Sequence, residues 1–234
     1  ILAWRARGGR VACAFGKVVC DSMVPMEGGP GHRNMADWLN HSIESVRGTD
    51  TLLLIKPHPH ELKNEIGSFL TEYFRDLIVG ELPDNVIYLG HDWFDLADMK
   101  ELIDVGTVFN GTTSTELALL EIPGILCSHF APIDYPIGQI VPRDRDHFRR
   151  LLCGEEETKL APDVPLRAAT WMKYLSGNDR IRDYRYHSRQ ITNKVVSPPY
   201  WFREDMAEYI LNGDPNIDII VDELMPKRSD ARAS

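Results

Sequence analysis

The sequence contains few cysteines, and no apolar run in it approaches the roughly 18 residues of a membrane-spanning helix. The four cysteines are Cys13, Cys20, Cys127 and Cys153. They include no Cys-x-x-Cys pair and have no histidine partner at zinc spacing, so we expect free thiols, with disulfide pairing as the alternative. The first ten residues are too short and too charged for a signal peptide. These absences predict a soluble, cytoplasmic protein.

The chain also lacks an excess of positive charge. Its 26 Lys and Arg against 35 Asp and Glu give a net charge of −9, which disfavours nonspecific binding to nucleic acid but leaves room for a local basic pocket. The 234 residues are 43% hydrophobic and 26% charged, close to the average of soluble globular proteins, so wholesale disorder is excluded. This length predicts one large domain or two small ones.

Short apolar runs alternate along the chain with longer stretches of helical periodicity. This pattern predicts an α/β fold, a Rossmann-like parallel sheet with flanking helices over residues 10–153. Strands are expected at 11–19, 51–55, 86–89, 107–109, 125–127 and 139–141, and helices at 34–47, 62–79, 96–103, 117–120 and 144–152. Asn34 is the expected N-cap of the first helix.

Beyond residue 153 the pattern changes. Residues 154–226 are expected to form a helical C-terminal extension, with helices at 167–175 and 204–211 joined by a polar, aromatic stretch without strand signals. Residues 227–234 are expected to be a disordered tail. Ligands of open parallel sheets bind at the carboxyl ends of the strands, so candidate site residues are sought in the loops that follow each strand.

The first such loop is Lys-Pro-His-Pro-His-Glu, residues 56–61. Pro57 and Pro59 fix their own backbone and favour extended geometry in the residues before them, so the loop is stiff and holds His58 in place. An imidazole can donate to a phosphate oxygen or protonate a leaving group, and Lys56 adds positive charge. An ordinary loop with a structural histidine is the alternative. His58 and His60 also suggest a metal, but the intervening proline favours phosphate binding, and no metal is expected.

The second loop, residues 110–116, reads Asn-Gly-Thr-Thr-Ser-Thr-Glu and lies between a strand and a helix. Small residues, hydroxyl groups and free amides at a helix N-terminus form an anion site, so this loop is a candidate for phosphate binding. The candidate ligands are Asn110, Thr112, Thr113, Ser114, Thr115 and Glu116. A capping box that only starts the helix is the alternative.

Gly16 and Lys17, at the exit of the first strand, form a third candidate. Glycine permits an unusual backbone conformation, and the lysine can reach a phosphate. A purely structural bulge explains the two residues equally well.

The two motif loops together resemble the C-terminal, donor-binding half of bacterial capsule and surface-polysaccharide glycosyltransferases of the GT-B type. That group includes Kdo transferases, polysialyltransferases and, more distantly, teichoic-acid polymerases. His58-Pro59 matches the His-Pro motif of these enzymes, and residues 112–116 match their Ser/Thr-rich motif. The segment 37–39 also resembles the group. The resemblance covers roughly residues 10–153.

The resemblance implies sugar transfer from a nucleotide-activated donor, CMP-linked or UDP-linked, with no further cofactor. His58 and residues 112–115 would neutralise the departing phosphate, and Asp21 is the candidate general base in this chain. The implied partners are a glycan or glycolipid acceptor, an N-terminal domain and the capsule assembly machinery, with peripheral association at the inner membrane. The chain begins at Ile1 and shows one Rossmann-like domain; if it is a fragment, it is expected to bind nucleotide but to transfer poorly by itself.

Two other functions compete with this one. A nucleotide-sugar epimerase of the same architecture would need carboxylates in the cleft, where the first loop offers Glu61. A non-catalytic nucleotide- or polysaccharide-binding module would bind without turnover.

Overall fold

The computed structural model describes residues 1–19, 24–62, 72–93, 95–176, 187–188, 191–192, 195–196 and 200–224. The chain divides into two compact units, Ile1–Ser176 and Gly177–Ser234. The domain boundaries expected from the sequence stay a prediction, because compactness alone does not tell which segments fold independently.

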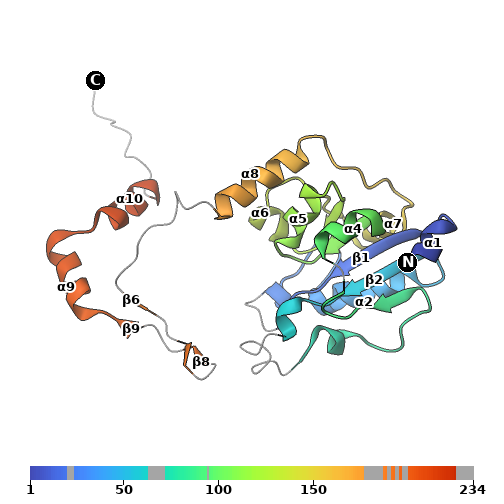
Figure 1. The fold of residues 1–234 in the computed structure, drawn as a ribbon, viewed down its shortest axis with the longest axis horizontal. Coiled ribbons are helices and arrows are strands. Elements are labelled where there is room, and N and C mark those ends of the chain that lie inside the picture. The colour runs from blue at the N-terminus through green and yellow to red at the C-terminus, as the bar shows by residue number, and fades with distance from the viewer. Residues whose placement is uncertain are drawn as a thin grey trace. The chain divides into compact units, whose positions relative to one another are not determined.

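The first unit contains a five-stranded parallel sheet, drawn in Figure 1, with the order β3-β2-β1-β4-β5. Its strands are β1 (Arg10–Phe15), β2 (Thr51–Lys56), β3 (Val86–Tyr88), β4 (Val105–Val108) and β5 (Gly124–Leu126). Nearly every residue of β1, β2, β4 and β5 is buried, as expected of strands covered on both faces. The predicted α/β fold with a parallel sheet and flanking helices is confirmed.

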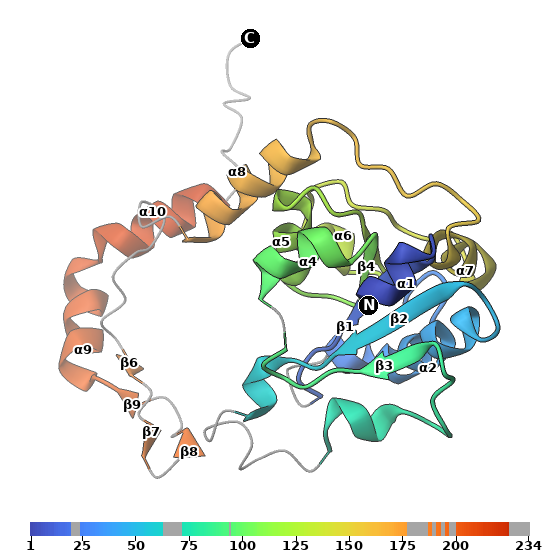
Figure 2. The same cartoon turned by 45° about the vertical axis from the view of Figure 1, so that its right-hand side comes forward.

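Helices cover both faces of the sheet (Figure 2). One face packs against α2 (Met35–Val46) and α7 (Arg145–Cys153). The other packs against α1 (Leu2–Ala6), α4 (Leu96–Leu102), α5 (Thr113–Leu119) and α6 (Ala131–Asp134). Alternate residues of each strand point to opposite faces, so Ala12 and Ala14 join the first cluster while Val11, Cys13 and Phe15 join the second.

Helix α2 follows its sequence closely. Asn34 is the N-cap, as predicted, and its side chain accepts a hydrogen bond from the Asp37 amide at 2.8 Å. The apolar face that defined the helix in the sequence is buried, and Trp38 donates from Nε1 to Thr107 Oγ1 at 3.0 Å under the sheet.

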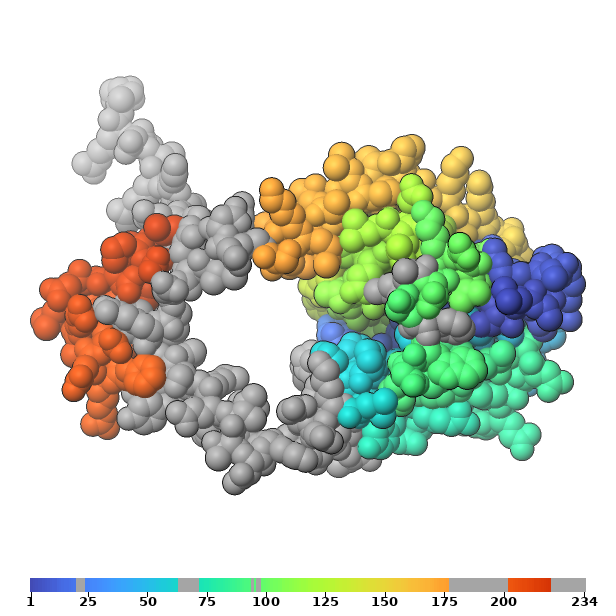
Figure 3. All heavy atoms as spheres, in the orientation of Figure 1, coloured from blue at the N-terminus to red at the C-terminus, as the bar shows by residue number. Residues whose placement is uncertain are grey.

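Helix α8 (Val164–Ser176) packs on α5 and is seen in orange on the surface of the first unit in Figure 3. Val164 and Ala168 of α8 are fully buried against Ala118 and Ile137. The helix predicted at 167–175 is therefore confirmed and begins slightly earlier in the chain.

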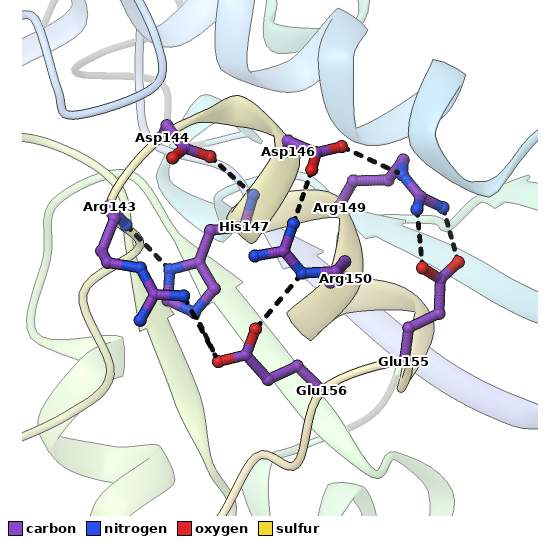
Figure 4. A network of polar contacts seen from close by, with 8 residues as sticks. All are labelled: Arg143, Asp144, Asp146, His147, Arg149, Arg150, Glu155 and Glu156. Carbon is purple, nitrogen blue, oxygen red and sulfur yellow. Dashed lines mark hydrogen bonds and ion pairs between the residues drawn. The ribbon is translucent and has the colours of Figure 1, made fainter.

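A network of hydrogen bonds and ion pairs between side chains stabilises α7 and the turn after it (Figure 4). The N-cap Asp144 accepts from the His147 amide at 2.8 Å, and His147 Nε2 lies 3.0 Å from Glu156 Oε1. Arg149 pairs with Glu155 through two contacts of 2.5 and 2.6 Å. This network ties both ends of α7 together, and the cavity described below is lined by other residues.

Some sequence-based expectations for the first unit are wrong. The strand expected at 11–19 ends at Phe15, and the next residue, Gly16, lies against the ring of Phe74, where a larger side chain has no room. The sixth strand expected at 139–141 is reduced to an isolated bridge between Ile125 and Ile140, directly after the turn at Gly138 with its φ of 87°. In the helix expected at 62–79, residues 63–71 lie outside the described residues. The rest contains only the short 3-10 helix η3 (Phe74–Leu77), whose first residue turns into the core.

The described residues of the second unit form short antiparallel strand pairs and two helices. Strand β6 (His187–Ser188) pairs with β9 (Tyr200–Trp201), and β7 (Ile191–Thr192) pairs with β8 (Val195–Val196). They are followed by α9 (Arg203–Asn212) and α10 (Pro215–Leu224). The expectation of no strands here is wrong, because two-residue pairs depend on local turns and are too short to show a period of two. The helix expected at 204–211 is confirmed, and the expected tail lies outside the described residues.

Three cysteines, Cys13, Cys127 and Cys153, are free thiols, as predicted for them, and Cys20 lies outside the described residues. Burial raises the pKa of Cys127 to about 12, and the hydrogen bond between Thr107 and Cys127 opposes this shift. Among the described helices, none combines the length and the apolar character needed to cross a membrane.

Candidate functional site

The parallel register brings three strand ends to one edge of the sheet. Phe15, the last residue of β1, pairs with Lys56 at the end of β2 and with Val108 at the end of β4. The loops that leave these strands therefore start side by side. They are the loops that carry the residues singled out in the sequence.

A cavity lies at this edge, with two lobes of about 440 and about 490 Å³. Sites for small molecules usually lie within this range of volumes. Six residues line both lobes: Phe15, Gly16, His58, His60, Thr112 and Thr113. The shared wall thus combines residues from the loops after β1, β2 and β4.

The loop after β2 holds His58 in a defined state. Pro57 is buried, and Pro59 begins the 3-10 helix η2 (Pro59–Leu62). This turn places the His60 amide 3.1 Å from His58 Nδ1, which accepts its hydrogen bond. In the neutral ring the proton is therefore on Nε2, so the ring carries an N–H donor as part of the cavity wall.

The hydroxyl residues of the loop after β4 form two sets, one lining the cavity and one buried. Thr112 is exposed, precedes α5 as its N-cap residue and makes no side-chain capping bond, so the capping box considered from the sequence is not formed. Thr112 and Thr113 line the cavity. Ser114 and Thr115 are fully buried, and Ser114 Oγ donates to Gly111 O at 2.8 Å. The structure therefore places Ser114 and Thr115 behind the cavity wall.

The loop after β1 contributes Gly16 and Lys17. A Cβ on Gly16 would lie 2.6 Å from Cδ1 of Phe74, a ring that is fully buried. Glycine is therefore required by the core beneath the loop, and Gly16 also lines both lobes of the cavity, so both interpretations of this position stay open. Lys17 lines the first lobe.

The remaining candidates make structural contacts. The Lys56 ammonium donates to Trp93 O, and its Nζ is 3.5 Å from His91 O, while burial lowers its pKa. Asn110 Nδ2 donates to Glu27 Oε2 at 3.1 Å and to Asp134 Oδ2 at 2.9 Å. Both candidates still contribute to the lining of the cavity.

Pro59 and Glu116 both line the second lobe. Glu116 is partly buried, and this burial raises the pKa of its carboxyl group. The candidate base Asp21 lies outside the described residues. No group of three or more His, Cys, Asp or Glu side chains suited to a metal ion occurs in the ranges that the structure describes.

Sequence analysis did not single out three lining residues of the second lobe, His91, Asp95 and Met99. His91 lies 2.9 Å from the buried carboxylate of Glu61, measured from Nε2 to Oε2. It closely follows β3, so the rule that drew attention to His58 would also have pointed to His91. Glu61, the carboxylate that the first loop offers, lies in the first turn of η2 and is buried.

The sequence matches no protein-family model and no curated protein. Solved structures with a similar fold include three glycosyltransferases. The "Glycotransferase of kitacinnamycin" is 18% identical, with a TM-score of 0.39 and 71% of this chain and 39% of that chain covered. The calicheamicin glycosyltransferase CalG4 is 15% identical, with a TM-score of 0.40 and coverages of 72% and 40%. SnogD from Streptomyces nogalater is 18% identical, with a TM-score of 0.36 and coverages of 73% and 40%.

The chain thus spans about two fifths of the length of the solved structures that it matches. At these identities and TM-scores, the similarity does not establish a function for this chain.

Proposed function

We propose that this chain is the donor-binding half of a glycosyltransferase that transfers a sugar from a nucleotide-activated donor. The observation that carries the proposal is the shared wall of the cavity, where His58, Gly16 and the hydroxyl residues Thr112 and Thr113 meet from three strand ends. An N–H donor, hydroxyl groups and a nearby lysine suit a phosphate group.

In the reaction, an acceptor hydroxyl attacks the anomeric carbon of the donor sugar. The bond from that carbon to the phosphate oxygen breaks, the nucleotide leaves with the bonding electrons, and the hydroxyl proton passes to a base. His58, Thr112 and Thr113 stabilise the negative charge that develops on the leaving phosphate. Asp21 is the proposed base in this chain, and an N-terminal domain of the whole protein would supply much of the acceptor side.

A CMP-linked donor is the first candidate, with a UDP-linked donor second, and no further cofactor is required. The CMP assignment, and a place in capsule or surface-polysaccharide synthesis at the cytoplasmic face of the inner membrane, rest on the resemblance of the His-Pro and Ser/Thr motifs. The acceptor is then a glycan or glycolipid.

Nucleotide binding tests the proposal directly. We expect CMP, CDP, UDP or GDP to raise the midpoint of thermal unfolding, because a ligand that binds only the folded state stabilises it. His58→Ala removes a charge-assisted hydrogen bond, which corresponds to a loss of roughly ten- to hundredfold in affinity. His129→Ala is the matched control, since His129 is exposed and belongs to neither lobe. Equal binding by both variants and the wild type would refute the assignment.

A nucleotide-sugar epimerase is the second candidate, because Asp95 and Glu116 place carboxylates in the second lobe. Product analysis on the complete protein separates the possibilities. Free nucleotide with an elongated acceptor indicates a transferase, and an isomerised nucleotide sugar indicates an epimerase. Binding without turnover indicates a non-catalytic module.

A further inference from the structure

Glu61 is a buried carboxylate with donors on both oxygens. Its side chain has no exposed surface, while that of His91 is 20% exposed. Oε1 accepts from the Phe74 amide at 2.8 Å, and Oε2 lies 2.9 Å from His91 Nε2. An ionised carboxylate can only accept hydrogen bonds, so its partner Nε2 carries a proton.

The backbone around His91 is held from the same loop. Lys56 donates to Trp93 O, and its Nζ lies 3.5 Å from His91 O. Residues 56–61 therefore hold the main chain at His91 through Lys56 and the ring of His91 through Glu61. The ring therefore has a set position in the second lobe, which it lines.

This pairing determines what His91 can offer a ligand. With the proton on Nε2, the neutral ring has a lone pair on Nδ1, and no hydrogen bond to that nitrogen is found among the residues that the structure describes. His58 has the opposite role, since its Nδ1 is occupied by the His60 amide and its Nε2 carries the proton. The cavity wall thus combines one imidazole donor with one imidazole acceptor.

We propose that His91 is a specificity-determining residue of the cavity, which accepts a hydrogen bond at Nδ1 from an O–H or N–H group of the ligand. Glu61 is the positioning residue that sets this role. A phosphate oxygen without a proton cannot serve, so the group is a hydroxyl or an amine. Given the proposed function, on which this step rests, the group is the ribose 2′-hydroxyl or the exocyclic amine of cytosine.

The pairing itself is tested without any ligand. Histidine ¹⁵N chemical shifts at about pH 8, above the ordinary histidine pKa of about 6.5, report which ring nitrogen carries the proton. The signal of His91 is assigned by its loss in His91→Gln. We expect a proton on Nε2 and none on Nδ1, and a protonated Nδ1 would overturn the inference.

The ligand group is tested with CMP, 2′-deoxy-CMP and UMP. The wild type is expected to bind either 2′-deoxy-CMP or UMP about fivefold more weakly than CMP, the effect of one neutral hydrogen bond. A weaker 2′-deoxy-CMP identifies the hydroxyl as the donor, and a weaker UMP identifies the amine. In His91→Gln we expect CMP to bind about fivefold more weakly and this discrimination to disappear.

Two further variants separate positioning from simple packing. Glu61→Gln keeps an acceptor for the ring but can also present its own N–H₂ to Nε2, so discrimination should weaken while the fold is retained. His129→Gln, in an exposed position, should leave discrimination unchanged. Full discrimination in both His91→Gln and Glu61→Gln would overturn the proposal.

The proposed function and the Glu61–His91 pairing can be refuted independently of each other. If the wild-type protein binds none of these three nucleotides and none of CDP, UDP and GDP, the proposed function falls, and the ligand-binding role of His91 falls with it. The ¹⁵N chemical shifts test the Glu61–His91 pairing alone, whether or not a nucleotide binds.

Discussion

Acid should destabilise the first unit through a pair of buried histidines. His32 is 4% exposed, and its Nε2 lies 2.9 Å from Nδ1 of His41. Both rings pack against Phe148, with centroids 4.8 and 5.4 Å away. Burial, followed by the charges of His41 and Arg145, lowers the pKa of His32 to about 3, and burial and Arg145 lower the pKa of His41 to about 4.

Protonation of the two histidines differs between the folded and unfolded states, and this difference decides whether acid stabilises or destabilises the fold. Between the folded values and the ordinary pKa of 6.5, the unfolded chain binds more protons than the folded one, so the free energy of unfolding decreases as the pH falls. For His32 alone, the loss between about pH 8 and pH 5 is about 2 kcal/mol. His41 is only partly buried, so solvent screening reduces its share, and the pair together should lose about 2–3 kcal/mol.

Urea unfolding at these two pH values measures the loss. The double variant His32→Leu, His41→Leu has neither titrating ring, so its free energy of unfolding should depend less on pH by about 2–3 kcal/mol, whatever its absolute stability. His129→Gln removes an exposed histidine and should retain the full wild-type dependence. An equal pH dependence in the wild type and the double variant would refute the reasoning.

Three substitutions test other parts of the first unit, each by chemical denaturation. Gly16→Ala places a Cβ 2.6 Å from the Phe74 ring and should lower the free energy of unfolding by about 1–3 kcal/mol, so an unchanged value would contradict the packing argument. Asn85→Leu removes an amide that donates to three backbone carbonyls, at 2.6, 2.9 and 3.3 Å, and should cost about 2 kcal/mol or more. Asn34→Ala removes the N-cap bond to Asp37 and should cost about 1 kcal/mol, whereas Asn34→Asp should retain most of it.

The framework of the fold could be predicted from the sequence because its signals are local. The continuous apolar run at 51–55 predicts a strand covered on both faces, and β2 is such a strand. The N-cap and apolar face of α2 are likewise contained within its own residues. The strand order β3-β2-β1-β4-β5 then brings the loops after β1, β2 and β4 together.

The details of the site depend on contacts between distant segments, which no local pattern contains. Thr113 and Ser114 are neighbours with similar side chains, yet Thr113 lines the cavity and Ser114 is fully buried. Neighbouring side chains of a helix point in different directions, and the packing of α5 decides which of them is buried. The partners of Lys56 and Glu61 also lie on another loop, and sequence proximity could not identify them.

The loop of residues 56–61 therefore has two tasks, divided among its side chains. His58 lines the cavity, whereas Lys56 and Glu61 bind the backbone and the ring of the loop after β3. A change at Glu61, which lines neither lobe, should thus alter ligand binding through His91, without a direct contact to the ligand. Because the two prolines limit how far the loop can move, the donor imidazole of His58 and the acceptor imidazole of His91 are set in position together. Under the proposed function, this cavity would select ligands that carry an anionic oxygen near a hydroxyl or amine, as a nucleotide does.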